Sequence, residues 1–303
     1  MPLLSLHNVH KGFDGRSTRA EVLRDVEFRV EEGEFVAVVG WSGAGKTTLL
    51  SLMSGLLKPD IGRALFDGSE ITGPGPERAV VFQNYSLLPW LNVLENVRLA
   101  VDSVLPKAPE RVRHERAIRY LEMVGLLEAV AKKPAQLSGG MRQRVSVARA
   151  LAMEPRVLLL DEPLGALDAL TRGMLQEELV RIRQQSGTTV VLITNDVDEA
   201  LLTADRMVPL TAGPAATLGP SFQVHVPHPR DRRTLRSEPE FVRLRREIVA
   251  FLLGEGGRTT ARVSRQLVLP DLAPEDLTYG RPLTKGGRRA LRRSEIRREE
   301  VDI

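Results

Sequence analysis

The chain has 303 residues, 42% of them hydrophobic and 27% charged, with a formal net charge of +4, which is typical of an ordinary soluble globular protein with one large domain. It has no cysteine, which excludes disulfides and thiolate metal sites and fits a reducing cytoplasm. It also lacks a signal-peptide pattern and any run of about 18 apolar residues. We therefore expect it to reach a membrane only by docking on another protein.

The first strands are predicted from alternation. Residues 3–9 and Val22 to Val30 alternate apolar and polar side chains, and Phe35 to Val39 is apolar throughout. This pattern predicts two antiparallel edge strands, with Gly12 to Gly15 in the turn between them, leading into a buried central strand.

A phosphate-binding loop follows the third strand. The spacing Gly40-x-x-x-x-Gly45-Lys46-Thr47 fits a strand that turns into a helix. Glycines let backbone N–H groups approach phosphate oxygens, and the helix start adds its positive end. A glycine-rich turn without a ligand is the alternative for this motif alone. The nucleotide-binding residues predicted here are Gly40, Trp41, Ser42, Gly43, Ala44, Gly45, Lys46, Thr47 and Thr48.

The middle of the chain changes from strands to helices. Short strands are predicted near Arg63 to Phe66 and at Ala79 to Gln83. Helical patterns then cover Asn92 to Val101 and Pro109 to Val124, and Gly125 is a stop signal. A helical insert therefore separates the early strands from the later ones.

An acidic pair ends the next apolar strand. Val157 to Leu160 leads into Asp161 and Glu162, and Thr188 to Thr194 is a further buried strand. Asp161 can hold Mg²⁺ through a water, and Glu162 can polarise the water that attacks a γ-phosphate. Solvated carboxylates at a strand end are the alternative. Helical patterns at Thr171 to Gln185 and Val197 to Ala204 alternate with these strands, which predicts a parallel sheet with covered faces.

A second anion site is predicted at the string LSGGMRQR. Ser138 and two glycines open a helix that continues through Val145, Ala148 and Leu151. Because one phosphate loop already serves one nucleotide, this helix start suggests a nucleotide held by another subunit.

The C-terminal third is less regular. Pro214 to Arg233 is proline-rich, with a short β segment near Phe222 to Val226, and Pro239 to Leu253 is an amphipathic helix. Little fixed structure is expected from residue 254 onward. Residues 281–298 contain eight basic side chains and one acidic one. This is either a contact for an anionic partner, such as RNA or lipid headgroups, or a solvated disordered tail, and we favour the tail.

Taken together, these motifs make the chain resemble an ATP-binding subunit of an ABC transporter. GWSGAGKT resembles the family's Walker A motif, LSGGMRQR its signature and VLLLDEP its Walker B motif, while Gln83 fits the Q-loop and residues 165–168 the D-loop. The resemblance implies an α/β fold with a parallel core sheet, an antiparallel β edge and a helical subdomain at about residues 85–150. It covers residues 3–212, followed by an extension at 213–253 and a tail at 254–303.

The family resemblance implies ATP and Mg²⁺ as ligands and a head-to-tail dimer. Phe13 occupies the position where the family stacks an aromatic ring on adenine, with core packing as the alternative. Thr47, Gln83 and Asp161 are the implied metal ligands, and Glu162, Gln83 and the residue at position 195 the implied catalytic residues. The residues implied to act on a nucleotide of the other subunit are Ser138, Gly139, Gly140 and Asp168.

The resemblance also implies partners and a location. Transmembrane permease subunits, a second nucleotide-binding subunit and a solute-binding protein or domain would complete the system at the cytoplasmic face of the inner membrane. Residues 84–90, NYSLLPW, would expose apolar side chains to a permease helix, and a core position for Trp90 is the alternative.

Further strings resemble one importer branch. VVFQNYSLLPWLNVLENV, residues 73–78 and VDEALLTADR are similar to importers of nitrate, sulfonates, taurine and cyanate, and the region after Asp205 is closest to nitrate importers. A sulfonate, taurine, cyanate or bicarbonate importer is the alternative. One departure is Asn195, where the family usually has histidine at the γ-phosphate. Asparagine carries no charge at neutral pH, so we expect slow hydrolysis at this chain's own site and a heterodimer with a competent partner; adequate substitution by Asn195 is the alternative.

Two other functional classes would also use parts of this sequence. A soluble ABC ATPase acting on nucleic acid or ribosomes would use the basic tail, but such proteins usually resemble two nucleotide domains or carry a long coiled coil, so we expect no nucleic-acid partner. A regulatory ATP-binding protein with little hydrolysis is disfavoured by Glu162 and weakly favoured by Asn195.

Overall fold

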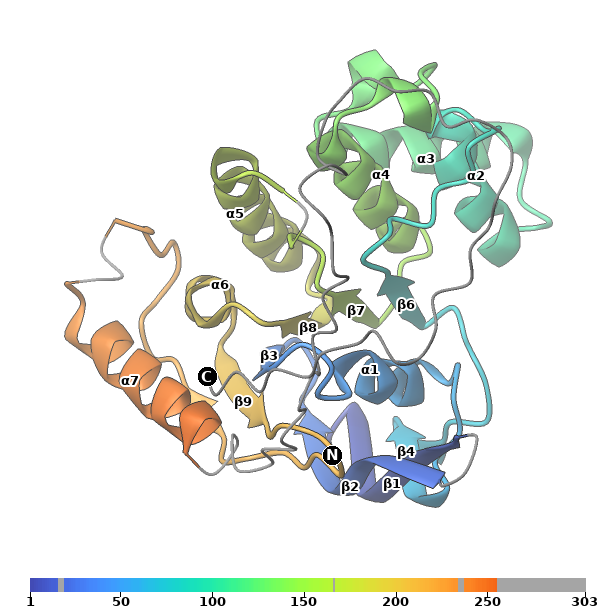
Figure 1. Cartoon of the computed structure of the whole chain (residues 1–303). Helices are drawn as coiled ribbons and strands as arrows, with labels where there is room; N and C mark the ends of the chain where they lie inside the picture. The colour runs from blue at the N-terminus through green and yellow to red at the C-terminus, as the bar shows by residue number, and fades with distance from the viewer. Residues whose placement is uncertain (16–18, 166, 234–236, 255–303) are drawn as a thin grey trace, which may run out of the picture. The chain divides into compact units, whose positions relative to one another are not determined.

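The structure is a computed structural model that describes residues 1–15, 19–165, 167–233 and 237–254, and within them six strands form the sheet that carries the phosphate loop. The strand order is β10 (Phe222–Gln223), β9 (Arg206–Leu210), β3 (Phe35–Gly40), β8 (Thr189–Thr194), β7 (Val157–Asp161) and β6 (Arg78–Val81). All neighbouring pairs are parallel except β10 with β9. The predicted parallel sheet is confirmed, and the carboxyl ends of β3, β6, β7 and β8 lie at one edge (Figure 1).

A separate antiparallel sheet contains the N-terminal strands. Its order is β2 (Arg19–Val30), β1 (Leu4–Asp14), β4 (Ile61–Phe66) and β5 (Ser69–Glu70). The two first strands are antiparallel as predicted, but they do not lie along the edge of the parallel sheet. The free edge of β1 pairs with β4, so no edge of β1 is left for β3. Residues 12–14 also continue β1 rather than forming a turn, because Phe13 pairs with Ala20.

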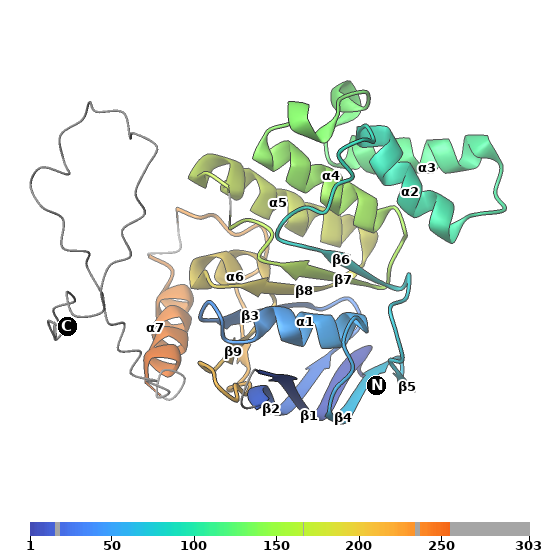
Figure 2. The ribbon, with the colours of Figure 1, turned by 45° about the vertical axis from the view of Figure 1, so that its right-hand side comes forward.

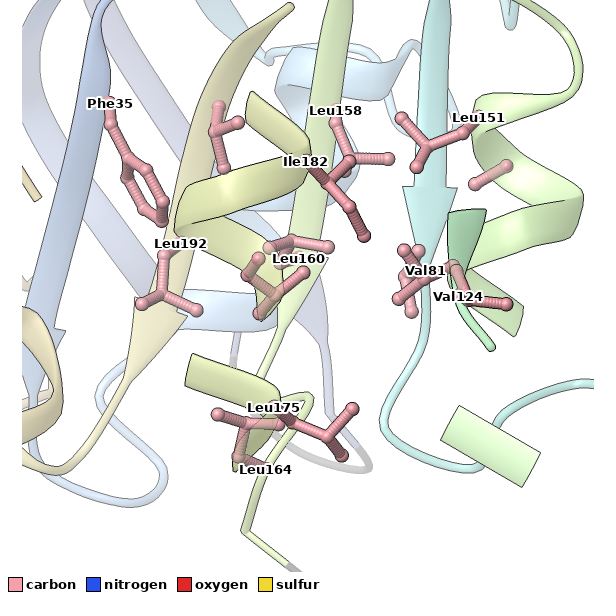
Figure 3. Packing of buried hydrophobic residues seen from close by; sticks show 14 of the residues in the cluster. Phe35, Val81, Val124, Leu151, Leu158, Leu160, Leu164, Leu175, Ile182 and Leu192 are labelled. Atoms are coloured by element: carbon pink, nitrogen blue, oxygen red, sulfur yellow. The ribbon is translucent and has the colours of Figure 1, made fainter. Parts of the chain in front are cut away.

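Helix α1 (Lys46–Ser54) lies between the two sheets (Figure 2). The residues of β3 alternate between two cores: Val36 and Val38 pack with α1 and the antiparallel sheet, whereas Phe35, Ala37 and Val39 face the other helices. A strand whose two faces are both covered must be apolar throughout, which explains the uninterrupted apolar run. Figure 3 shows the second core, with Leu160, Ile182 and Leu192 among its side chains.

Helices cover the other face of the parallel sheet. They are α2 (Val93–Val104), α3 (Glu110–Met123), α4 (Gly139–Leu151), α5 (Ala169–Ser186) and α6 (Val197–Thr203), with short 3₁₀ turns at Leu127–Ala129 and Pro134–Gln136. Asn92 and Glu95 start α2 with a reciprocal capping box, in which each side chain accepts a hydrogen bond from the other residue's backbone N–H. Gly125 has φ +66°, a left-handed conformation that suits the end of α3.

The extension after residue 212 packs on the same domain. Helix α7 (Pro239–Leu253) has the predicted bounds and buries Phe241, Leu244, Ile248 and Leu252. Strand β9 was not predicted, and β10 is shorter than the predicted segment. Gly254 is the only residue of the predicted tail that the structure describes; residues 255–303 lie outside it. No helix in the described ranges is both long and apolar enough to span a membrane.

Candidate nucleotide site

The phosphate loop wraps around its own lysine. Gly45 has φ +98°, and α1 starts at the next residue without a side-chain cap, so its first N–H groups have no side chain bound to them. The Lys46 ammonium is buried and donates to the carbonyl oxygens of Gly40 at 3.0 Å and Trp41 at 2.8 Å. A Cβ at Gly45 would lie 2.8 Å from the Val22 side chain, so close packing as well as φ requires glycine there.

The acidic pair meets this loop. Lys46 Nζ lies 3.0 Å from Glu162 Oε1, and the Thr47 hydroxyl donates to Asp161 Oδ1 at 3.3 Å. Asp161 is the last residue of β7 rather than the first residue after it, and it is buried. Burial raises the pKa of the Asp161 carboxyl above its usual range, while the hydrogen bond from Thr47 opposes that rise. The structure therefore brings together two adjacent pairs of residues, Lys46 with Thr47 and Asp161 with Glu162, that lie far apart in the sequence.

A divalent cation fits the donor atoms of this pair. A hydroxyl and a carboxylate are the hard oxygen ligands that Mg²⁺ accepts, and Mg²⁺ usually keeps several waters and phosphate oxygens as its other ligands. Within the described residues there is no group of three or more His, Cys, Asp or Glu that could hold a metal by itself. Nucleotide and water would have to complete the coordination.

Gln83 and Asn195 lie at the same edge of the sheet. Gln83 is exposed in a turn after β6, so the predicted strand through Gln83 is two residues too long. Asn195 is exposed and directly follows β8. Because β6 pairs with β7 and β8 pairs with both β3 and β7 in parallel, these two side chains leave the sheet at the edge that carries Gly40 and Asp161.

A cavity of about 400 Å³ opens beside the phosphate loop. It is lined by Ala20, Glu21, Val22, Trp41, Ser42, Gly43, Ala44, Ala212, Gly213 and Pro214. Phe13 is 43% exposed, so its ring is not part of the core, and its backbone pairs across the sheet with Ala20, one of the residues that line this cavity. The core alternative for Phe13 is therefore wrong. The indole N–H of Trp41 donates to the Leu252 carbonyl at 3.2 Å, which connects the loop to the end of α7.

The signature residues form a second cluster with the D-loop. The Ser138 side chain caps α4 by accepting from the Met141 N–H at 3.3 Å. A Cβ on Gly140 would clash with the Thr171 methyl group, and a Cβ on Gly139 would lie 3.3 Å from Leu167. Asp168 caps α5 by accepting from the Thr171 N–H at 3.0 Å. The two signature glycines thus lie against Leu167 and Thr171, which lie on either side of Asp168 in the chain.

The segment after Gln83 is held by the signature helix. The Tyr85 carbonyl accepts hydrogen bonds from Ser146 at 3.0 Å and Arg149 at 3.1 Å, and Arg149 also donates to the Ser86 carbonyl at 2.6 Å. Burial lowers the pKa of Arg149. Trp90 is 66% exposed, so the core alternative for it is wrong. Sequence reasoning did not identify Ser146 or Arg149, because their partners are backbone carbonyls about sixty positions away in the chain.

Several known proteins are similar to this chain in sequence. A family model described as "ABC transporter" matches residues 23–165. The Nitrate import ATP-binding protein NrtC of Synechocystis sp. is 50% identical over 255 residues, which is 83% of this chain but 38% of that protein. This chain therefore spans well under half the length of NrtC.

Other relatives match over most of their length. The Nitrate transport protein NasD of Klebsiella oxytoca is 49% identical over 252 residues, covering 83% of this chain and 96% of NasD. The Bicarbonate transport ATP-binding protein CmpD of Synechococcus elongatus is 49% identical over 251 residues, covering 83% of this chain and 90% of CmpD.

A solved structure shares the fold. The ATP-binding cassette MJ0796, described as a dimer in a post-hydrolysis state bound to ADP and Pi, matches with a TM-score of 0.66 and 32% identity, covering 74% of this chain and 99% of that chain. The identity to NasD, over nearly all of that protein, is well above what a shared fold alone requires. The chain therefore belongs to the ABC transporter family and carries its ATP-binding domain.

Proposed function

We propose that this chain is the ATP-hydrolysing subunit of an importer, with nitrate or nitrite as the solute. ATP hydrolysis is supported by one observation: Lys46 and Thr47 contact Glu162 and Asp161 at one edge of the parallel sheet. The full-length similarity to NasD supports nitrate.

Nucleotide binding would exchange the partners of Lys46. In this structure its ammonium is bound by Glu162 and two loop carbonyls, all of them oxygen acceptors. The β- and γ-phosphates bring several charged oxygens to the loop, against the single carboxylate of Glu162, so they would take the ammonium and release Glu162. The free N–H groups at the start of α1 would bind the same phosphates.

Hydrolysis would then depend on residues at the sheet edge. Glu162, once released, would accept the proton of the attacking water, with Gln83 and Asn195 beside it. Thr47 and Asp161 would hold Mg²⁺, with Gln83 as a further ligand, and the bound cation would neutralise charge on the phosphates. Phe13 would stack on the adenine beside the cavity that Trp41 and Ala20 line.

The second nucleotide site would be shared with another subunit. Ser138, Gly139, Gly140 and Asp168 would contact a nucleotide bound to a second ATP-binding subunit, in a head-to-tail dimer. Because Asn195 replaces the family's histidine, we infer that the site built on Lys46 is the slower one and that the dimer is a heterodimer.

The proposed permease contact rests on Trp90, the exposed large hydrophobic residue of the segment 84–90. Trp90 offers an exposed aromatic surface for a transmembrane permease subunit, and a solute-binding protein or domain would deliver the solute from outside. The chain would act at the cytoplasmic face of the inner membrane as a peripheral subunit, without a nucleic-acid partner.

Bicarbonate is the second candidate solute, because CmpD is as similar to this chain as NasD is. The test is ATP hydrolysis by the full complex in proteoliposomes, stimulated by nitrate or by bicarbonate. Glu162→Gln is placed in this chain alone, then the equivalent change in the partner ATPase alone. A slow own site predicts a small loss from Glu162→Gln and a near-complete loss from the partner's change. Equal losses would contradict the asymmetry, and stimulation by bicarbonate alone would reassign the solute.

A further inference from the structure

Three residues around position 195 bind one another. The Thr194 hydroxyl donates to the Glu199 carboxylate, and the Asp196 N–H donates to the same hydroxyl oxygen at 3.0 Å. The Asp196 carboxylate in turn accepts the N–H groups of Asp198 at 2.9 Å and Glu199 at 3.1 Å, which caps α6. The exposed Asn195 therefore lies between two residues that are both hydrogen-bonded to Glu199.

We propose that Glu199 is a positioning residue for position 195: its carboxylate holds the Thr194 hydroxyl, which in turn accepts the Asp196 N–H, so that the two neighbours of Asn195 are fixed and with them the direction of the Asn195 side chain. This inference rests on the proposed function, since position 195 matters only if it faces a γ-phosphate. Glu199 itself is 4% exposed and lies behind the strand end, so it acts through Thr194 and Asp196 rather than by touching nucleotide.

Burial of the Glu199 carboxylate lowers the stability of the fold, which indicates that this residue has a role beyond packing. Glu199 Oε1 is buried and has no hydrogen-bond partner among the described residues. An unpartnered buried polar atom destabilises a fold, and an apolar residue of similar size would avoid that cost. A charged acceptor, however, binds the Thr194 hydroxyl more strongly than a neutral group does.

Ionisation of Glu199 changes near neutral pH. Burial raises its pKa to about 7, the hydrogen bond from Thr194 lowers it, and the nearby Asp196 and Glu162 carboxylates and the Arg172 guanidinium act with smaller effects. Asp198, on the same helix, is paired with Arg245 of α7 at 2.8 Å. Because the ionised carboxylate is the stronger acceptor for Thr194, the position of Asn195 should be held most firmly above neutral pH.

Arg172 extends the same contacts to the D-loop. Its guanidinium lies 3.6 Å from the Asp196 carboxylate and donates to the Leu167 carbonyl at 3.1 Å, one residue before Asp168. A shift of Asp196 would therefore also disturb the hydrogen bond from Arg172 to the Leu167 carbonyl. Leu167 lies against the signature glycine Gly139.

Two measurements on the full chain test this inference. The first is the pH dependence of ATP turnover between pH 6 and 8.5 by an assembled complex whose partner ATPase carries a glutamine at its own catalytic glutamate, so that only the site built on Lys46 turns over. This chain carries Glu199→Gln, or Glu177→Gln as a matched change at an exposed position of α5. In that complex we expect kcat to rise with pH through about 7 when this chain is unmutated and when it carries Glu177→Gln. In Glu199→Gln we expect no such rise, a kcat about tenfold lower above neutral pH and an unchanged KM for ATP.

The second measurement does not need activity. Hydrogen exchange of the Asp196 amide in the full chain should be about tenfold faster in Thr194→Val and in Glu199→Leu than in Glu177→Gln, because the acceptor of that N–H is lost or freed to rotate. Unchanged exchange would overturn the inference whatever the complex transports. Faster exchange together with a pH profile of Glu199→Gln that matches the unmutated one would also overturn it. Absence of solute-stimulated hydrolysis would instead count against the proposed function.

Discussion

Lys46 and Glu162 form an ion pair, with 3.0 Å between Nζ and Oε1, across the mouth of the phosphate loop. Lys46, which is expected to bind phosphate, is thus paired with Glu162, which is expected to activate water. Glu162 adopts a left-handed conformation with φ +43°, which is rare for a non-glycine residue and is often found at functional sites. The pair predicts competition between Glu162 and nucleotide for the same ammonium.

Glu162→Gln should bind ATP more tightly while losing turnover at the site built on Lys46. Removing the carboxylate takes away both the competing partner of Lys46 and a negative charge near the phosphates. An ion pair of this partly exposed kind is worth about 1 kcal/mol, so the dissociation constant for ATP should fall about fivefold. Equilibrium binding of a fluorescent ATP analogue measures it, with Glu177→Gln as the control. Weaker binding by Glu162→Gln would show that Glu162 supports the phosphates instead of competing for Lys46.

Asn195→His should speed hydrolysis at the site built on Lys46. A histidine can donate to the γ-phosphate as a charged group, which an asparagine cannot do, so turnover should rise about tenfold. The measurement is ATP hydrolysis by a complex whose partner ATPase carries a glutamine at its own catalytic glutamate. Unchanged turnover would mean that Asn195 is an adequate substitute.

Gly140→Ala should destabilise the contact between α4 and α5. The added methyl group would overlap the Thr171 side-chain methyl, and overpacking of this kind costs about 2 kcal/mol in the free energy of unfolding. Thr171→Ser removes that methyl group and should restore most of the loss in the double variant. Urea unfolding provides the measurement, with Gly73→Ala as a control, since no atom lies within 4 Å of a Cβ built at Gly73. A double variant no more stable than Gly140→Ala would contradict the assigned clash.

Arg230→Met should loosen the extension. The buried Arg230 guanidinium donates to four carbonyls, two in the extension and two at the end of α6, namely those of Val224, Val226, Leu201 and Ala204. Burial lowers the pKa of Arg230 to about 10, so it stays charged at neutral pH. Leaving these acceptors without a donor should cost about 3 kcal/mol in the free energy of unfolding. Arg232→Met, at an exposed position, is the control and should cost little in the same urea titration.

Glu199→Gln should stabilise the fold at alkaline pH. Burial raises the pKa of Glu199 in the folded state to about 7, from its ordinary value of 4.5. The folded state therefore favours the protonated form of Glu199. The contribution of this group to the free energy of unfolding is fully present below pH 4.5 and is lost as the pH rises through 7. That difference corresponds to about 3 kcal/mol, so the variant should exceed the unmutated chain by about this amount at pH 8 and match it at pH 4.5.

Comparing the two proteins at each pH isolates Glu199 from other groups. Burial also lowers the pKa of His228, to about 4, which reduces stability on acidification in both proteins alike. Unfolding by urea at pH 4.5, 6, 7 and 8 gives the required free energies. A constant difference across this range would contradict the raised pKa.

Several features of this protein were determined by short segments of sequence alone. The apolar strands at Phe35 and Val157, the glycine spacing of the phosphate loop and the apolar face of α7 depend on residues close together in the chain, so local patterns predicted them. The parallel sheet followed from these elements, because strands that alternate with helices must pair in parallel. That pairing brought Asp161 to the edge where Lys46 lies.

Only the tertiary structure decided the rest. Whether β1 pairs with β3 or with β4, whether Trp90 is buried or exposed, and whether a strand forms around Pro209 all depend on partners distant in sequence. The same holds for the ion pair of Lys46 with Glu162 and for the bonds of Arg149 to the segment after Gln83. Glu199 reads in sequence as one more charged residue of a short helix, and only its burial behind Thr194 gives it a partner and a raised pKa. Burial and pairing are properties of the folded chain, so no local pattern contains them.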